Sequence, residues 1–144
     1  MMNARAGFNA LVFLALAGLH AYWATGGTWG FTASLPAHPG GAVIFRPGRG
    51  MVWAVGAILL ALALLSMAHL LPGRLGRPTG WLRAVDWAVA SGLGLRVLGD
   101  FKFVGLSKRV HDTTFARLDT RYYTPLCLVL AAGFAGLAFA AAPR

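Results

Sequence analysis

The chain has 144 residues, of which 58% are hydrophobic and only 12% are charged, and its mean hydropathy is +0.65. Four Asp and no Glu stand against thirteen Lys and Arg, for a formal net charge of +9. Soluble domains are usually about 25% charged, so these values exclude a disordered chain, a secreted disulfide scaffold and a water-soluble globule. They predict a single integral membrane domain over residues 1–144.

The first predicted span covers residues 6–24 and is interrupted only by Asn9 and His20. About 20 apolar residues are enough to cross the bilayer core as a helix. Arg5 and the motif Ala15-Leu16-Ala17 would also suit a cleaved signal peptide. The apolar run continues beyond that motif to Trp23, which favours a retained span.

A loop rich in Gly and Pro follows over residues 25–50, and its composition predicts turns rather than a helix. The second predicted span covers residues 51–71, with Ser66 and His69 as its clearly polar residues. The short segment 72–80 then reads PGRLGRPTG, which indicates a tight connection between antiparallel helices.

The third predicted span, residues 81–98, carries Arg83, Asp86 and Arg96. A central Asp or Arg costs about 2.5–3.5 kcal/mol on insertion scales, and small residues four apart, such as Ala88 and Gly92, allow close helix approach. We therefore expect this helix to be the least exposed to lipid, shielded by the other three.

Helical geometry places Asp86, Arg96 and Asp100 within an arc of about 80°. Arg96 and Asp100 are four residues apart and are expected to pair, provided that Gly94 and Gly99 do not bend or end the helix. Two interpretations stay open. The charges form a buried ligand or ion site, or they form a structural pair with Arg96 snorkelling to the head groups.

In the third loop, Asp112 or Thr113 is expected to cap an interfacial helix that continues into the fourth predicted span, residues 123–142. Three aromatic residues would anchor that helix, namely Phe101, Phe103 and Phe115. Its cations would face lipid phosphates, either as a solvated basic loop or as a specific lipid pocket.

Four spans place both termini on one side of the membrane. With Arg96 left out as intramembrane, the first and third loops carry seven cations and the opposite side carries five, Arg83 included. The positive-inside rule then favours cytoplasmic first and third loops in a cell inner (plasma) membrane. Cations spread over loops in this way are typical of orientation and of attraction to anionic lipid, so no nucleic-acid partner is expected.

The histidines do not predict a haem or another metal site. His20 and His69 end successive antiparallel spans on opposite membrane faces, so they cannot share an iron. A metal site shared by His20 and either His38 or His111 stays geometrically open. His69 is expected to form a structural pair with Asp86 across the second loop.

The single Cys127 forbids an intrachain disulfide and a multi-thiolate site, and a buried inert thiol is expected. The hydrolase, metalloprotease and phosphate-loop motifs are absent from the sequence. No metal and no cofactor is predicted.

Two strings carry a resemblance: LHAYWATGGTWG at 19–30, and RVLGD at 96–100 followed by FARLDTRYYTPLC at 115–127. Together they resemble a family of small bacterial four-span membrane proteins catalogued as a domain of unknown function. The resemblance covers nearly the whole chain and implies the four-span architecture. It implies no activity, ligand or catalytic residue.

The sequence therefore predicts an all-α, four-helix transmembrane bundle that binds a lipid, a small ligand or a partner protein through one polar membrane face. The candidate binding residues are His20, Tyr22, Trp23, Arg96, Asp100, Lys102, Asp119 and Tyr122. Arg96 and Lys102 would contact an anionic group such as a lipid head group, Asp100 would orient Arg96, and the aromatic residues would line the site.

Two alternatives belong to other classes. The first is a membrane-embedded enzyme with His20 or Asp100 as general base, for which the sequence identifies no substrate. The second is an accessory subunit of a larger membrane complex or a homo-oligomer. Its contact would be the small-residue stripe Ala132, Gly136 and Ala140.

Overall fold

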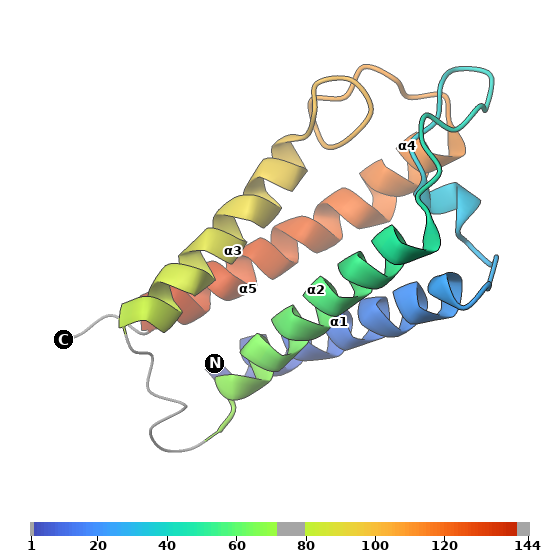
Figure 1. Cartoon of the computed structure of the whole chain (residues 1–144). Coiled ribbons are helices and arrows are strands. Elements are labelled where there is room, and N and C mark those ends of the chain that lie inside the picture. Colours follow the sequence, from blue (N-terminus) through green and yellow to red (C-terminus); the bar gives the residue numbers. More distant parts are fainter. Residues whose placement is uncertain (1, 72–79, 141–144) are drawn as a thin grey trace.

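The apolar runs form long helices, and the computed structural model describes residues 2–71 and 80–140 (Figure 1). Within these residues the chain is an all-α bundle, as predicted, and the only extended pairing is an isolated bridge between Ala37 and Val43. The elements are α1 (Met2–Ala24), the 3-10 turn η1 (Thr32–Ser34), α2 (Arg49–Ala68), α3 (Gly80–Leu98), α4 (Thr114–Leu118), the π-helical η2 (Asp119–Tyr123) and α5 (Thr124–Ala140). The predicted tight second loop lies outside the described residues.

Three helices are long and apolar enough to cross a membrane, which supports the assignment of a membrane protein. They cover Asn3–Ala24, Arg49–Ala68 and Thr114–Ala140. The third is continuous through α4, η2 and α5, because the π-helical turn joins the two α-helical stretches. The helix α3 has 19 residues but is more polar, and it is not one of these three.

The long helices pack as two pairs, α1 with α2 and α3 with α5, and contacts between α1 and α5 join the pairs (Figure 1). In the described chain, the backbones of α2 and α3 do not approach each other closely. The core lies between α1 and α5, where the rings of Phe13 and Phe134 meet at a tilt with centroids 5.9 Å apart and where Leu130 and Leu137 are buried. Small residues on α5, such as Gly133, permit the close approach of α1 to α5.

The expectation that the other three helices shield α3 is wrong. Among the long helices α3 packs closely only on α5, and Trp81, Leu95 and Leu98 are exposed. The central helix is instead α5, because its small side chains allow both α1 and α3 to pack against it. Of the small-residue stripe, Ala132 and Ala140 are exposed, whereas the guanidinium of Arg5 lies against Gly136.

The predicted His69–Asp86 pair is confirmed. His69 Nε2 lies 3.1 Å from Asp86 Oδ1, and both side chains are fully buried. The pair links the end of α2 to α3. The start of α1 and the end of α5 lie at this same end of the bundle, as four antiparallel helices require (Figure 1).

At the opposite end the first and third loops lie together (Figure 1). The first loop consists mainly of turns, as predicted, apart from the three residues of η1 and the bridge between Ala37 and Val43; α2 begins at Arg49, two residues before the predicted span. The predicted cap of the third loop is also confirmed, since Thr113 Oγ1 accepts the backbone N–H of Ala116 at 3.1 Å and α4 begins at Thr114. The candidate site residues lie in the third loop or on the helix ends that adjoin these two loops.

Candidate functional site

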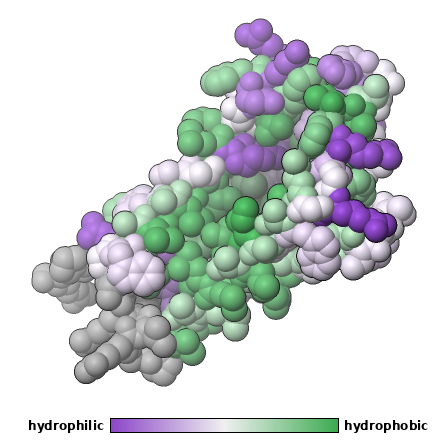
Figure 2. Space-filling model, viewed as in Figure 1, coloured by the Kyte–Doolittle hydropathy of each residue, from purple (hydrophilic) through white to green (hydrophobic). Residues whose placement is uncertain are grey.

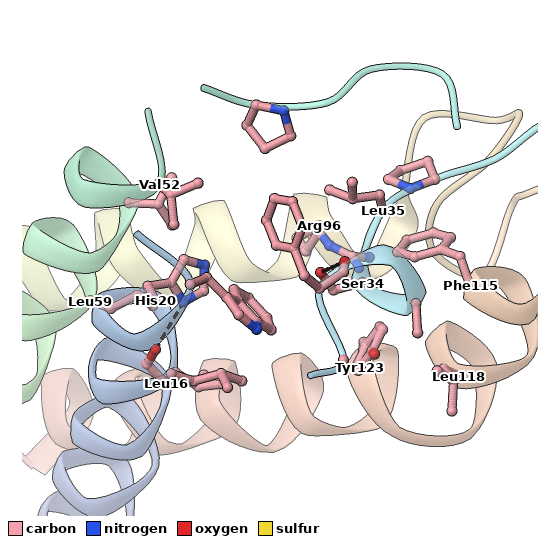
Figure 3. A pocket seen from close by; sticks show the side chains of 18 of the residues that line it. Leu16, His20, Ser34, Leu35, Val52, Leu59, Arg96, Phe115, Leu118 and Tyr123 are labelled. Atoms are coloured by element: carbon pink, nitrogen blue, oxygen red, sulfur yellow. Dashed lines mark hydrogen bonds between the residues drawn. The ribbon is translucent and has the colours of Figure 1, made fainter. Parts of the chain in front are cut away.

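A cavity of about 990 Å³ lies between the two helix pairs at the loop end. Its wall is mostly apolar and includes Leu16 of α1, Val55 and Leu59 of α2, Leu93 of α3 and Leu130 of α5. Figure 3 shows side chains from these elements and from the first loop arranged around it. Figure 2 shows hydrophobic surface over the helices and hydrophilic side chains gathered toward the loop end.

The first loop covers one side of the cavity and is tied to α1 by aromatic contacts. Trp23 donates its Nε1–H to the carbonyl of Trp29 at 2.8 Å, and its ring meets that of Phe31 at 5.6 Å. His20 lies one helical turn before Trp23, with ring centroids 5.0 Å apart, and its Nδ1 is 2.8 Å from the carbonyl oxygen of Leu16. His20 and Trp23 thus contribute a polar edge to an apolar wall.

The main charged feature of the cavity wall is Arg96, whose position depends on a buried carboxylate behind it. Arg96 Nη2 donates to Asp119 Oδ1 at 2.6 Å. Asp119 Oδ2 accepts three further donors: Lys108 Nζ at 2.8 Å, the Gly105 amide at 2.9 Å and Thr124 Oγ1 at 3.2 Å. Asp119 is fully buried, and the side chain of Lys108 is 3% exposed. We call these five residues the Asp119 cluster.

Local backbone geometry assembles this cluster. The π-helical turn directs the N–H of Thr124 to the carbonyl of Asp119, so that Thr124 lies beside the Asp119 carboxylate. Such π turns occur preferentially at functional sites. Gly105 has φ +80° and lies so close to the end of α3 that a β-carbon there would be 2.6 Å from Gly99 Cα. Only glycine allows the amide of residue 105 to reach Asp119 in this conformation.

The predicted Arg96–Asp100 pair does not form. α3 ends at Leu98, and Gly99 with φ +91° turns the chain away, so Asp100 is not on the helical face of Arg96. Asp100 Oδ1 instead accepts the backbone N–H groups of Lys102, Phe103 and Val104 at 2.7–3.0 Å. Asp100 therefore stabilises its own loop, and Asp119 is the residue that orients Arg96.

The bonds of Asp100 lead to a pH-dependent prediction. Desolvation raises the pKa of this carboxyl, but hydrogen bonds from the three backbone N–H groups outweigh it and hold the pKa below its ordinary value. We expect Asp100→Asn to be less stable than the wild type at neutral pH. This difference should shrink as the pH falls below about 4 and through the lower pKa of the folded state, because protonation then removes the wild-type advantage.

Unfolding monitored by circular dichroism at neutral and acidic pH tests this prediction. Asp112→Asn is the matched control, since Asp112 is exposed in the same loop. If the stability difference between Asp100→Asn and the wild type does not change with pH, the charge of Asp100 is not what stabilises the loop, and the prediction is wrong.

The structure brings some candidate residues together and separates others. His20, Trp23, Arg96 and Asp100 border the cavity, and Asp119 lies directly behind Arg96. Three candidates are exposed and do not line it. Tyr22 packs against the turn at Gly27, Lys102 lies over the ring of Phe103, and Tyr122 lies beside Arg121.

Sequence reasoning missed Lys108, Thr124, Phe115 and Tyr123. Lys108 resembles any loop cation in the sequence, and no local pattern marks it as buried. Phe115 was expected to anchor in lipid but is buried, because it packs on Tyr123 with centroids 6.0 Å apart. Tyr123 could have been predicted, because it lies four residues after Asp119 and therefore on the same helix face. Tyr122, the tyrosine chosen as a candidate, is rotated by about 100° from Tyr123 around the helix axis.

The arrangement also bears on metal and acid–base chemistry. Among the described residues, no group of three or more His, Cys, Asp or Glu is placed to hold a metal ion. His20 and Asp100 both border the cavity, but no hydrogen bond links them in that part of the chain. His38 packs on Phe103 with centroids 5.6 Å apart, and Cys127 is half-buried on the cavity wall.

Comparison with known proteins identifies one family. A family model described as "Protein of unknown function (DUF3995)" matches residues 13–134, which is most of the chain. No curated protein and no solved structure matches the chain. The match includes every residue of the cavity wall named above and the whole Asp119 cluster.

Proposed function

Since the chain belongs to the DUF3995 family, whose description names no activity, we propose its function from the geometry of its cavity. The protein is a four-span membrane protein, with α3 as the fourth span, and it binds a single-chain amphipathic molecule between its two helix pairs. The observation that carries this proposal is the apolar cavity of about 990 Å³ with Arg96 in its wall.

The size and lining of the cavity suit such a ligand. Small-molecule pockets have volumes of about 300–1,000 Å³ and are lined mainly by apolar side chains with a few polar groups. This cavity lies at the upper end of that range, and its polar groups, which include His20 and Arg96, are few. A hydrocarbon chain with one polar end would match this distribution.

The position of the cavity also supports a ligand that comes from the bilayer. Val55 and Leu59 of α2 and Leu93 of α3 line it, although the backbones of these two helices do not pack closely in the described chain. On the loop side, Phe31 and Leu35 of the first loop cover it. An apolar molecule would therefore reach the cavity between α2 and α3 rather than through the loops.

Filling the cavity tests the proposal. We expect Leu59→Trp to reduce binding of both palmitate and hexadecanol by about tenfold or more, because the larger side chain occupies the space of the hydrocarbon chain. Native mass spectrometry of the purified full-length chain in detergent would measure the bound fraction at increasing ligand concentration.

Leu60→Trp is the matched control, since Leu60 is the next residue of α2, is 43% exposed and does not line the cavity. This variant should bind both probes as the wild type does. Equal loss in the two variants, or no binding of either probe to the wild type, would contradict the proposed function.

A further inference from the structure

The charges around the cavity do not balance within the Asp119 cluster. Two cations, Arg96 and Lys108, face the single carboxylate of Asp119. Its Oδ2 already accepts three donors and its Oδ1 accepts Arg96. One positive charge is therefore left over beside an apolar cavity, on an arginine whose side chain is only 31% exposed. Such a charge is less well solvated than one in bulk water, so leaving it unbalanced is costly.

The excess is located at Arg96. The ammonium group of Lys108 is buried, and it already donates to Asp119 and to the carbonyl of Gly105 at 3.1 Å. Arg96 uses Nη2 for Asp119, whereas its Nη1 is buried without a hydrogen-bond partner in the described chain. A guanidinium has five N–H donors and binds carboxylates through two of them at once. Arg96 thus has donors free for a second anion.

Asp100 does not supply that anion. Asp100 borders the cavity, but it is exposed and its Oδ1 accepts three backbone N–H groups of its own loop. The structure shows no hydrogen bond or ion pair between Asp100 and Arg96 among the described residues. Water also screens the exposed charge of Asp100 far more than it screens a buried charge.

We propose that the ligand of the cavity is a single-chain lipid with one carboxylate, and that this carboxylate binds Arg96. This inference rests on the proposed function and adds the chemical class of the head group. Arg96 is held in place by Asp119, and Lys108 in turn balances Asp119, so the guanidinium is oriented before the ligand binds. A singly charged head group matches one excess positive charge and one unpartnered guanidinium nitrogen; a phosphate monoester carries more charge than this site balances.

A comparison of palmitate with hexadecanol, which share a chain length and differ in the head group, tests the inference on the wild-type protein. We expect palmitate to bind about tenfold or more tightly, because a charge-assisted hydrogen bond is worth more than a neutral one. Arg96→Gln should abolish this preference by weakening palmitate alone. Lys102→Gln, which removes an exposed cation that does not line the cavity, should preserve it.

Native mass spectrometry of the full-length chain gives the affinities, and a monoacyl phosphate of equal chain length completes the set. Equal binding of palmitate and hexadecanol by the wild type overturns the carboxylate assignment, while the loss caused by Leu59→Trp still supports the cavity. Tighter binding of the monoacyl phosphate also overturns it in favour of a phosphate. No binding of any probe overturns the proposed function itself. The wild-type comparison decides the question even if Arg96→Gln does not fold.

Discussion

Replacing Asp119 with asparagine is expected to lower the free energy of unfolding by about 3–5 kcal/mol, the range measured when one partner of a buried ion pair is removed. The asparagine keeps the shape of the side chain but loses the negative charge. Lys108, with 3% of its side chain exposed, is then a buried cation without a counter-charge. At least one of the four donors around the carboxylate would also face an amide N–H group instead of an acceptor.

Denaturant unfolding of the full-length chain in detergent, followed by circular dichroism, measures this loss. The control is Asp112→Asn, because Asp112 is exposed in the loop that precedes α4 and its replacement removes the same formal charge. Adding Lys108→Met to Asp119→Asn should recover part of the stability, since it removes the uncompensated buried cation. Strictly additive effects of the two substitutions would show that charge balance does not hold the cluster together.

Gly105→Ala is expected to cost at least about 2 kcal/mol, for two physical reasons. The residue has φ +80°, a conformation that costs an L side chain about 1–2 kcal/mol. Its new β-carbon would also lie 2.6 Å from Val97 O and Gly99 Cα, which are backbone atoms that move only if the loop shifts. Such a shift withdraws the amide that donates to Asp119, so ligand affinity should fall together with stability.

Gly92→Ala supplies the comparison, because Gly92 is helical and exposed, and a β-carbon there would meet no other atom within 4 Å. There alanine should stabilise α3 by up to about 1 kcal/mol through its higher helix propensity. Thermal unfolding of both variants distinguishes the backbone requirement at Gly105 from a general effect of adding a methyl group. A Gly105→Ala protein as stable as the wild type would argue against the close approach of this loop to α3.

Features that depend on local sequence were predictable. Unbroken apolar runs predicted the helices, since only a helix satisfies its own backbone in lipid. Thr113 was predictable as a cap because its side chain bonds the backbone three residues later. The His69–Asp86 pair followed from connectivity, because a short connection between antiparallel helices places these two residues at a similar height along the bundle axis.

The partner of Arg96 was not predictable in this way. Spacing on one helix favoured Asp100, four residues later, but Gly99 ends the helical path before that residue. The actual partner, Asp119, is 23 residues away in sequence and reaches Arg96 because α3 packs on α5. Likewise nothing near Lys108 in the sequence distinguishes it from the solvated cations of the same loop.

The sequence by itself determined that this chain is a bundle of apolar helices whose polar side chains gather at one end, because hydrophobicity and turn residues act locally along the chain. The tertiary structure alone decided which cation meets which carboxylate, and that the two helix pairs leave a cavity between α2 and α3. These features depend on how helices far apart in sequence pack against the small side chains of α5. In a chain with four acidic residues, that packing decides which of them holds the arginine that faces the cavity.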